Sequence, residues 1–133
     1  MKKLAMLAVA CLAAAWLRTV PVSADQGFLG ERDYQIFCAS CHGAMAKGDG
    51  PIAKSLPKHP PDLTRLTARN NAVFPDDTVF NTIDGRTGSA HNSQDMPAWG
   101  DVFAKSRESA GAEQAKARIT ALVAYLKTIQ EKQ

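Results

Sequence analysis

The seven residues FCASCHG, at positions 37–43, constrain this chain more than any other stretch. They place Cys38 and Cys41 three positions apart, and His42 follows the second cysteine directly. The only other cysteine in the chain is Cys11, near the start of the sequence. Whatever binds at this motif must therefore use two thiols and an imidazole without a third nearby cysteine.

The N-terminal residues have the pattern of a secretory signal. Lys2 and Lys3 provide a positive start, an apolar run covers residues 4–17, and small residues lead up to Ala24. The apolar run is shorter than the roughly 20 residues that a membrane-spanning helix needs. This favours a cleaved signal peptide at residues 1–24 over a membrane anchor, and predicts an exported, periplasmic protein without stable membrane insertion.

Removal of the signal changes the charge of the chain. It takes Lys2, Lys3 and Arg18 from the 16 basic residues and none of the 13 acidic ones, so the mature chain is neutral when histidines and termini are left out. Such a chain has no basic stretch interleaved with aromatic residues, which argues against nucleic acid as a partner. Residues 25–133 are predicted to form one small domain, whose modest core a bulky apolar prosthetic group would complete.

Four kinds of site compete for Cys38, Cys41 and His42. A disulfide between the two cysteines would close a very small loop and restrain the unfolded chain little. A thioredoxin-like pair needs a βαβ setting, whereas residues 30–37 before the motif have the pattern of a helix. Structural zinc needs four protein ligands, and His59 and His91 are isolated. Covalent haem attachment remains, and C-x-x-C-H is its signature.

Haem attachment gives every residue of the motif a role. Each thiol would add to one vinyl group of a single porphyrin, and His42 would bind the iron as the proximal ligand. Gly43 would let the backbone turn away from the ring. The motif therefore predicts one haem c, bound covalently through Cys38 and Cys41.

A second axial ligand would have to come from Met45, Met96, His59 or His91. Met45 lies too close to His42 to reach the opposite face of the ring. Met96 precedes Pro97, which keeps the backbone at Met96 extended, and this suits a thioether that projects from a loop. His59 and His91 lie in polar or proline-rich stretches that are typical of solvated loops. Met96 is therefore the predicted second ligand, although core packing is the ordinary role of such a methionine.

Along nearly all of its mature length the chain resembles a class I cytochrome c. Gly30, Tyr34 and Cys38 have the family's spacing, and CHGAMAKGDGP and MPAWG are similar to its haem motif and distal methionine loop. ARITALVAYLKTI resembles its C-terminal helix, where Leu122 and Tyr125 would meet the N-terminal helix. The resemblance implies a small all-α fold, in which the two terminal helices cross and loops and short helices wrap one haem.

The hydrophobic pattern agrees with an all-α domain. Apolar residues recur at three- and four-residue steps in the C-terminal segment and predict an amphipathic helix. These are Ala115, Ile119, Leu122, Val123, Leu126 and Ile129. The stretch FPDDTVFNTIDG predicts a short helix that begins at Pro75, ends at Gly85 and turns Val79, Phe80 and Ile83 inward. Residues 43–71 contain several prolines and no helical period, and are predicted to be a loop.

The expected function is that of a single-electron carrier. With His42 and Met96 on its two faces the iron would have no open site, which suits electron transfer and not substrate chemistry. Asp84, Asp95 and Asp101 lie near the methionine loop, but no base accompanies them, so no catalytic residues are predicted. Two alternatives remain: an electron-accepting subunit of a larger dehydrogenase or oxidase, and a haem sensor or enzyme with an open iron.

Two further features concern the surroundings of the haem. In the resembling family a proline carbonyl orients the proximal histidine, and the candidates here for His42 are Pro51, Pro57, Pro60 and Pro61. Trp99 would either donate a hydrogen bond to a haem propionate or pack in the core. Five basic residues would form a rim that steers acidic redox partners, with scattered solvated charges as the alternative. They are Lys47, Lys54, Lys58, Arg65 and Arg69. The protein would act as a monomer or within a hetero-complex.

Overall fold

The computed structural model describes residues 23–86, 96–106 and 111–132, and these residues form helices and connecting segments without a strand. The predicted all-α class is therefore confirmed. His91, Asp95, Cys11 and residues 1–22 of the predicted signal lie outside the described residues. In chain order the elements are α1 (Ser23–Phe37), α2 (Ala39–His42), η1 (Ala53–Ser55), η2 (Leu63–Arg65), α3 (Leu66–Arg69), α4 (Asp76–Asp84), α5 (Trp99–Lys105) and α6 (Ala112–Thr128).

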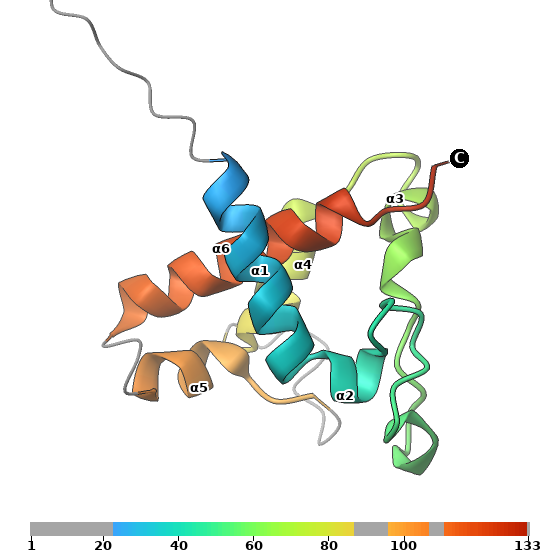
Figure 1. The fold of residues 1–133 in the computed structure, drawn as a ribbon, viewed down its shortest axis with the longest axis horizontal. Helices are drawn as coiled ribbons and strands as arrows, with labels where there is room; N and C mark the ends of the chain where they lie inside the picture. Colours follow the sequence, from blue (N-terminus) through green and yellow to red (C-terminus); the bar gives the residue numbers. More distant parts are fainter. Residues whose placement is uncertain (1–22, 87–95, 107–110, 133) are drawn as a thin grey trace, which may run out of the picture.

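The two long helices, α1 and α6, cross each other at the centre of the fold (Figure 1). Gly30 makes the crossing close, because a Cβ atom at this position would collide with the carbonyl of Ala121 and lie 2.9 Å from Cβ of Tyr125. Tyr34, one turn further along α1, is 1% exposed, and its ring centroid lies 5.4 Å from that of Tyr125. The predicted crossing of the two terminal helices is confirmed, and it lies at Gly30 and Tyr34.

Helix α6 supplies much of the core. The apolar stripe predicted for it is buried, and Ile129 lies partly buried at its C-terminal end. Residues spaced by three and four positions share one face of a helix, so a single face of α6 meets α1, α4 and α5. The buried members of the stripe are Ala115, Ile119, Leu122, Val123 and Leu126.

Helix α4 forms as its sequence predicts. Asp76 and Asp77 lie in its first turn, where their charges complement the helix dipole, and Gly85 ends it in the left-handed conformation with φ of 68°. Val79 and Ile83 are buried, and the partly buried Phe80 packs against the same core.

Four helical pieces differ from the sequence-based expectation. Residues 43–71 contain η1, η2 and α3 where the sequence predicts a plain loop, and α5 forms directly after the predicted methionine loop, where no helix is predicted. Each of these pieces is too short to show a helical period in its sequence. Helix α1 also begins at Ser23, ahead of the predicted start at Gly30.

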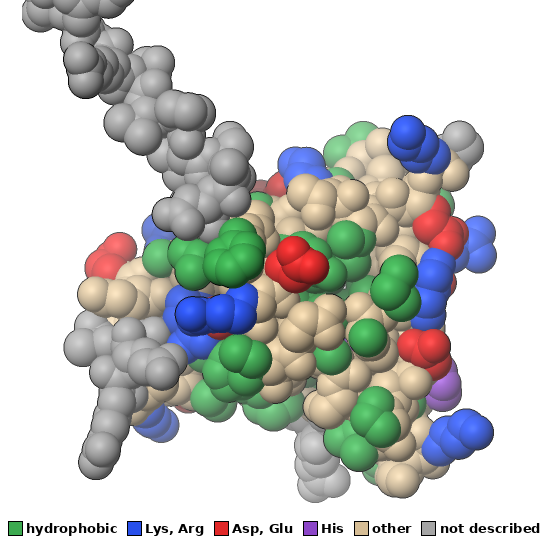
Figure 2. All heavy atoms as spheres, viewed as in Figure 1, with side chains coloured by type: hydrophobic (Ala, Val, Ile, Leu, Met, Phe, Trp, Pro, Cys, Tyr) green, Lys and Arg blue, Asp and Glu red, His purple; other side chains and the backbone are tan. Residues whose placement is uncertain are grey.

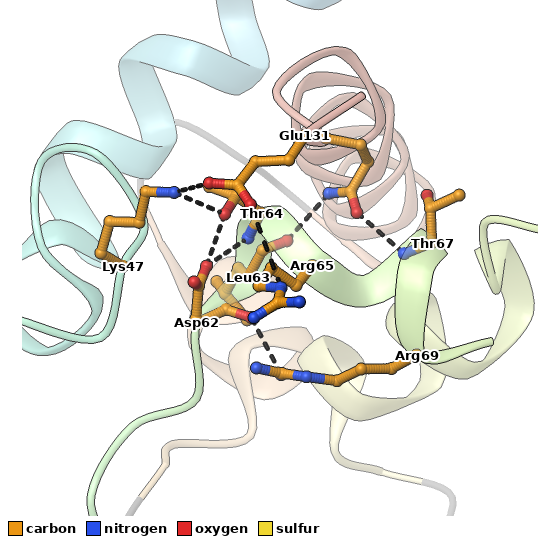
Figure 3. Close-up of polar contacts among 9 residues, drawn as sticks. Lys47, Asp62, Leu63, Thr64, Arg65, Thr67, Arg69 and Glu131 are labelled. Atoms are coloured by element: carbon orange, nitrogen blue, oxygen red, sulfur yellow. Dashed lines mark hydrogen bonds and ion pairs between the residues drawn. The ribbon is translucent and has the colours of Figure 1, made fainter. Parts of the chain in front are cut away.

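The chain segment that follows α6 is hydrogen-bonded to η2 and α3. Gln130 donates from Nε2 to the carbonyl of Leu63 at 2.8 Å, and its Oε1 accepts from the backbone N–H of Thr67 at 2.9 Å. The N–H of Glu131 donates to the carbonyl of Thr64 at 2.9 Å. These bonds hold the C-terminal segment against η2 and α3 (Figure 1; Figure 3). Within the described residues, none of the helices has the length and apolar character that crossing a bilayer demands.

Candidate functional site

A cavity of about 290 Å³ lies between the end of α1, the 43–71 segment, α4 and the residues around Met96. Its lining is mainly aliphatic and aromatic, with few polar groups, as is usual for the binding site of a small molecule or cofactor. The aliphatic walls come from widely separated parts of the chain. They include Leu56, Leu63, Leu66, Val79, Ile83 and Leu126.

Cys38, Cys41 and His42 all line this cavity. They lie on one helical turn that continues α1: the N–H of Cys38 donates to the carbonyl of Tyr34, and the N–H of His42 donates to that of Cys38, both at 2.9 Å. The two cysteines are free thiols and do not form a disulfide with each other. The turn thus presents two sulfurs and one imidazole to the same apolar space.

The backbone turns sharply after His42. Gly43 has φ of 82°, a left-handed value that favours glycine, and its N–H closes α2 on the carbonyl of Ala39 at 2.9 Å. Its own carbonyl accepts a 2.7 Å hydrogen bond from the hydroxyl of Tyr34. Burial raises the pKa of Tyr34, so this hydroxyl remains a donor at neutral pH. The predicted turn at Gly43 is therefore present and is anchored to the core.

The thiol of Cys38 lies in a strongly desolvated position. Burial, with smaller contributions from the charges of Asp33 and Cys41, raises its pKa to about 12. In the protein without a bound group this sulfur is therefore protonated at neutral pH.

Met96 lines the same cavity and packs against the core, although it lies far from the cysteine motif in the sequence. Met45 is 74% exposed and does not line the cavity. His59 is exposed at the edge of the lining, where its Nδ1 lies 2.9 Å from the carbonyl oxygen of Pro60. The structure thus brings Met96 together with the cysteine motif, and also places His59 nearer to the cavity than its sequence context indicated.

Aromatic residues close one wall of the cavity. Phe37 and Trp99 line it, and their ring centroids lie 5.5 Å apart, while Phe103 packs behind them at 5.3 Å from Phe37 and 5.5 Å from Trp99. Trp99 therefore packs against other core aromatics. Of the prolines considered as partners of His42, Pro60 and Pro61 line the cavity.

A buried ion pair lies behind this aromatic wall, and sequence analysis did not single it out. Nε of Arg118 donates to a carboxylate oxygen of Asp33 at 2.7 Å, and the two side chains are 15% and 4% exposed. The guanidinium carbon also lies 4.1 Å from the ring centroid of Phe103, which places the cation over the aromatic face. The pair joins α1 to α6, and its partners are 85 positions apart.

The predicted basic rim is partly neutralised. Lys47 pairs with Glu131 and donates to Thr64 at 3.0 Å, and Arg65 lies 3.9 Å from the same Glu131 (Figure 3). Arg69 donates to the backbone carbonyl of Asp62 at 3.0 Å. Figure 2 accordingly shows basic and acidic side chains interspersed along the edge of the molecule where the 43–71 segment lies. Lys54 and Lys58 are exposed, and Lys58 also lines the cavity.

Comparison with known protein families gives one match, over residues 28–126, to the family described as cytochrome C oxidase, cbb3-type, subunit III. A parallel comparison with curated proteins gave no match. The matched region runs from α1 into α6 and includes the cavity, its two cysteines, His42 and Met96. Cytochrome c domains of this kind carry haem c and transfer electrons. The chain therefore belongs to the cytochrome c family.

Proposed function

We propose that this protein is a single-electron carrier with one haem c, bound covalently through Cys38 and Cys41 and ligated by His42 and Met96. One observation carries the proposal: two thiols, an imidazole and a thioether, from two distant parts of the chain, line the same apolar cavity. This set of donors fits haem c, because it combines the C-x-x-C-H attachment motif with a His/Met ligand pair.

The cysteine turn is suited to covalent attachment. Each S–H would add across one vinyl C=C bond, with sulfur bonding to one carbon and hydrogen to the other, so that no atom is lost. Because both thiols lie on one helical turn, they are held relative to each other before attachment. The bond between Tyr34 and Gly43 fixes the turn that follows His42, and so limits the freedom of the imidazole.

Haem c supplies the redox chemistry, since its iron takes up one electron from a donor and passes one electron to an acceptor. His42 and Met96 would occupy its two axial positions, and methionine ligation raises the reduction potential. The aliphatic walls would keep water from the bound haem, and the packed core would hold His42 and Met96 in place. These residues favour electron transfer over substrate binding at the metal.

The surroundings of the cavity favour proteins as donor and acceptor. Lys58 lines the cavity and is exposed, and Lys54 is exposed in the same segment, whereas Lys47 and Arg65 share Glu131. Acidic redox proteins that approach the cavity mouth would be steered by these two lysines. We further propose that residues 1–24 are a cleaved secretory signal and that residues 25–133 act as the mature cytochrome c domain in the periplasm.

Absorption spectra of the protein, matured in a host that attaches haem c, test the proposal. We expect a sharp α band on reduction, haem that stays with the chain in denaturing gels, and a weak far-red band of the oxidised protein that marks sulfur-to-iron coordination. Met96→Ala should abolish the far-red band and open the reduced iron to carbon monoxide. Wild-type protein that lacks this band and binds carbon monoxide readily would instead support a sensor or enzyme with an open iron.

The family description also names a subunit of an oxidase, and this favours a second role for the same chemistry. The domain would then accept electrons within a larger complex instead of diffusing between partners. Purification from its native host under mild conditions distinguishes the two: a free carrier elutes alone, whereas a subunit elutes with a larger redox enzyme.

A further inference from the structure

We propose that Asp84, Arg86 and Gly100 together hold Met96 in the position where it would ligate the haem iron. The inference rests on the proposed function, because it assigns to these residues the task of holding the second axial ligand. Asp84 and Arg86 lie before Met96 in the sequence and Gly100 lies after it, yet the three residues meet in the structure.

Asp84 and Arg86 form a close ion pair. Nε of Arg86 donates to Oδ1 of Asp84 at 2.9 Å and Nη2 donates to the same oxygen at 2.7 Å, while Oδ2 lies 3.1 Å from Nε. The Asp84 side chain is 6% exposed and the Arg86 side chain 34%. A carboxylate buried to this extent depends on its partner, because loss of the guanidinium would leave a desolvated charge.

Gly100 gives the pair its contact with α5. A Cβ atom at Gly100 would lie 2.9 Å from Cγ of Asp84 and would be even closer to one of its oxygens. The same atom would come within 2.5 Å of Nε of Arg86. Any larger residue at position 100 would therefore push the ion pair and the start of α5 apart.

A second close contact lies beside the first. Gly85, which ends α4 with φ of 68°, approaches Ala98 so closely that a Cβ atom on Gly85 would lie 2.7 Å from Cα of Ala98. Asp101, in the first turn of α5, also acts electrostatically on Arg86 and helps to raise its pKa, after the larger effect of the hydrogen bond to Asp84. The approach of Gly85 to Ala98 and that of Gly100 to the Asp84–Arg86 ion pair thus bring the end of α4 against the beginning of α5.

This junction sets the position of Met96. Met96 lies two residues before Ala98, at one edge of the junction, and α4 forms a cavity wall through Val79 and Ile83. The junction consequently fixes the backbone beside Met96 relative to a wall of the haem cavity. Asp84, Arg86 and Gly100 do not themselves line the cavity, so they are positioning residues and act through Met96.

Helix α4 provides a matched control at its other end. Asp76 pairs with Lys127 at 2.9 Å, but both side chains are about half exposed, at 50% and 54%. Exposed pairs of this kind contribute little, and neither residue lies beside Met96. Lys127→Gln therefore removes one ion pair of α4 without touching the junction.

The experiment compares haem-loaded wild type with Asp84→Asn, Arg86→Gln, Gly100→Ala and Lys127→Gln. We expect the first three variants to lose much of the far-red band of the oxidised protein, and to bind carbon monoxide in the reduced state roughly tenfold faster, as expected when a buried charged contact is left unsatisfied. Arg86→Lys should recover part of the band, and Lys127→Gln should match the wild type. Circular dichroism of each variant shows whether the helices remain.

The reduction potential separates positioning from a simple charge effect. Removal of the negative charge of Asp84 would by itself raise the potential, whereas loss of methionine ligation would lower it. We expect Asp84→Asn to lower it. A folded Asp84→Asn variant with an intact far-red band and a raised potential would overturn the inference. If the wild type itself lacked the band, the proposed ligation by Met96 would be wrong, which is a different outcome.

Should Asp84→Asn fail to fold, Gly100→Ala and Arg86→Lys still decide the question, because both keep the carboxylate and a cation. Gly100→Ala displaces α5 from the ion pair, whereas Arg86→Lys keeps a cation beside Asp84. A weaker far-red band in Gly100→Ala than in Arg86→Lys would therefore show that displacement of the junction weakens methionine binding. A wild-type band in a folded Gly100→Ala variant would exclude a positioning role.

Discussion

The hydroxyl of Tyr34 on α1 donates a 2.7 Å hydrogen bond to the carbonyl of Gly43, the residue directly after His42. The two residues are nine positions apart, and the bond spans the whole cysteine motif. Tyr34 therefore links the crossing of α1 and α6, where its ring packs, to the backbone turn that follows the proposed proximal ligand.

Tyr34→Phe tests this link. The ring and its packing remain, but the buried carbonyl of Gly43 loses a donor, so we expect the free energy of unfolding to fall by about 1–3 kcal/mol. Chemical denaturation of the haem-loaded protein measures the change. Tyr125→Phe is the control, since its ring packs against Tyr34 while its hydroxyl interacts with the exposed Gln35. Equal stability losses in the two variants would contradict the proposed role of the Tyr34 hydroxyl.

Gly30→Ala should be destabilising although alanine favours helices. The added methyl group would collide with the Ala121 carbonyl and force α1 away from α6, at a cost of roughly 1–3 kcal/mol. Gly27→Ala, in the same helix, has no atom within 4 Å of the new methyl group and should stabilise the protein by about 0.5–1 kcal/mol. Thermal unfolding should show a lower midpoint temperature for Gly30→Ala and a higher one for Gly27→Ala than for the wild type. A change of the same sign in both variants would show that the crossing is not as close as described.

The ion pair of Asp33 and Arg118 should be costly to break. Arg118→Ala leaves a carboxylate that is 4% exposed with only the exposed Arg32, 3.5 Å away, as a cation, and removes the guanidinium from the face of Phe103, so we expect a loss near the lower end of about 3–5 kcal/mol. Replacing both partners, as in Asp33→Leu with Arg118→Met, should recover most of that loss because no buried charge remains. A double-mutant cycle from urea unfolding gives both values; additive losses would refute the coupling.

Charge reversal at Lys54 and Lys58 should slow electron transfer to an acidic partner protein. Both lysines are exposed and Lys58 borders the cavity, so glutamates there would repel such a partner and lower the second-order rate constant, most clearly at low ionic strength. Lys116→Glu, on the exposed side of α6, changes charge without touching the cavity lining. Stopped-flow rates over a range of salt concentrations provide the measurement, and equal slowing by Lys116→Glu would point to net charge alone.

Helices with a repeating apolar pattern or with recognisable end residues were predictable from the sequence. Helix α6 repeats its apolar residues over several turns, and α4 is marked by aspartates at its start and Gly85 at its end, so local rules suffice for both. The cysteine motif forms one helical turn because residues 30–37 already continue into it as helix. The presence of Met96 on the same cavity also agrees with its sequence context.

Short elements and distant ion pairs were not predictable in the same way. Helix α5 has seven residues, too few to display a period. The partners Lys47 and Glu131 are 84 positions apart, and no local pattern connects two such charges. For the same reason the basic rim predicted from the sequence was too large. It included Lys47 and Arg65 as free positive charges, whereas the tertiary fold pairs both with Glu131.

The bonds from Gln130 and Glu131 to η2 and α3 also bear on the order in which the protein is assembled. Leu63, which forms part of the cavity wall, is bonded through its carbonyl to Gln130, a residue translated long after the cysteine motif. A nascent chain therefore contains its attachment motif before the residue that fastens this part of the wall. Until the segment beyond α6 has been synthesised, residues 63–67 lack the three hydrogen bonds that Gln130 and Glu131 make with them.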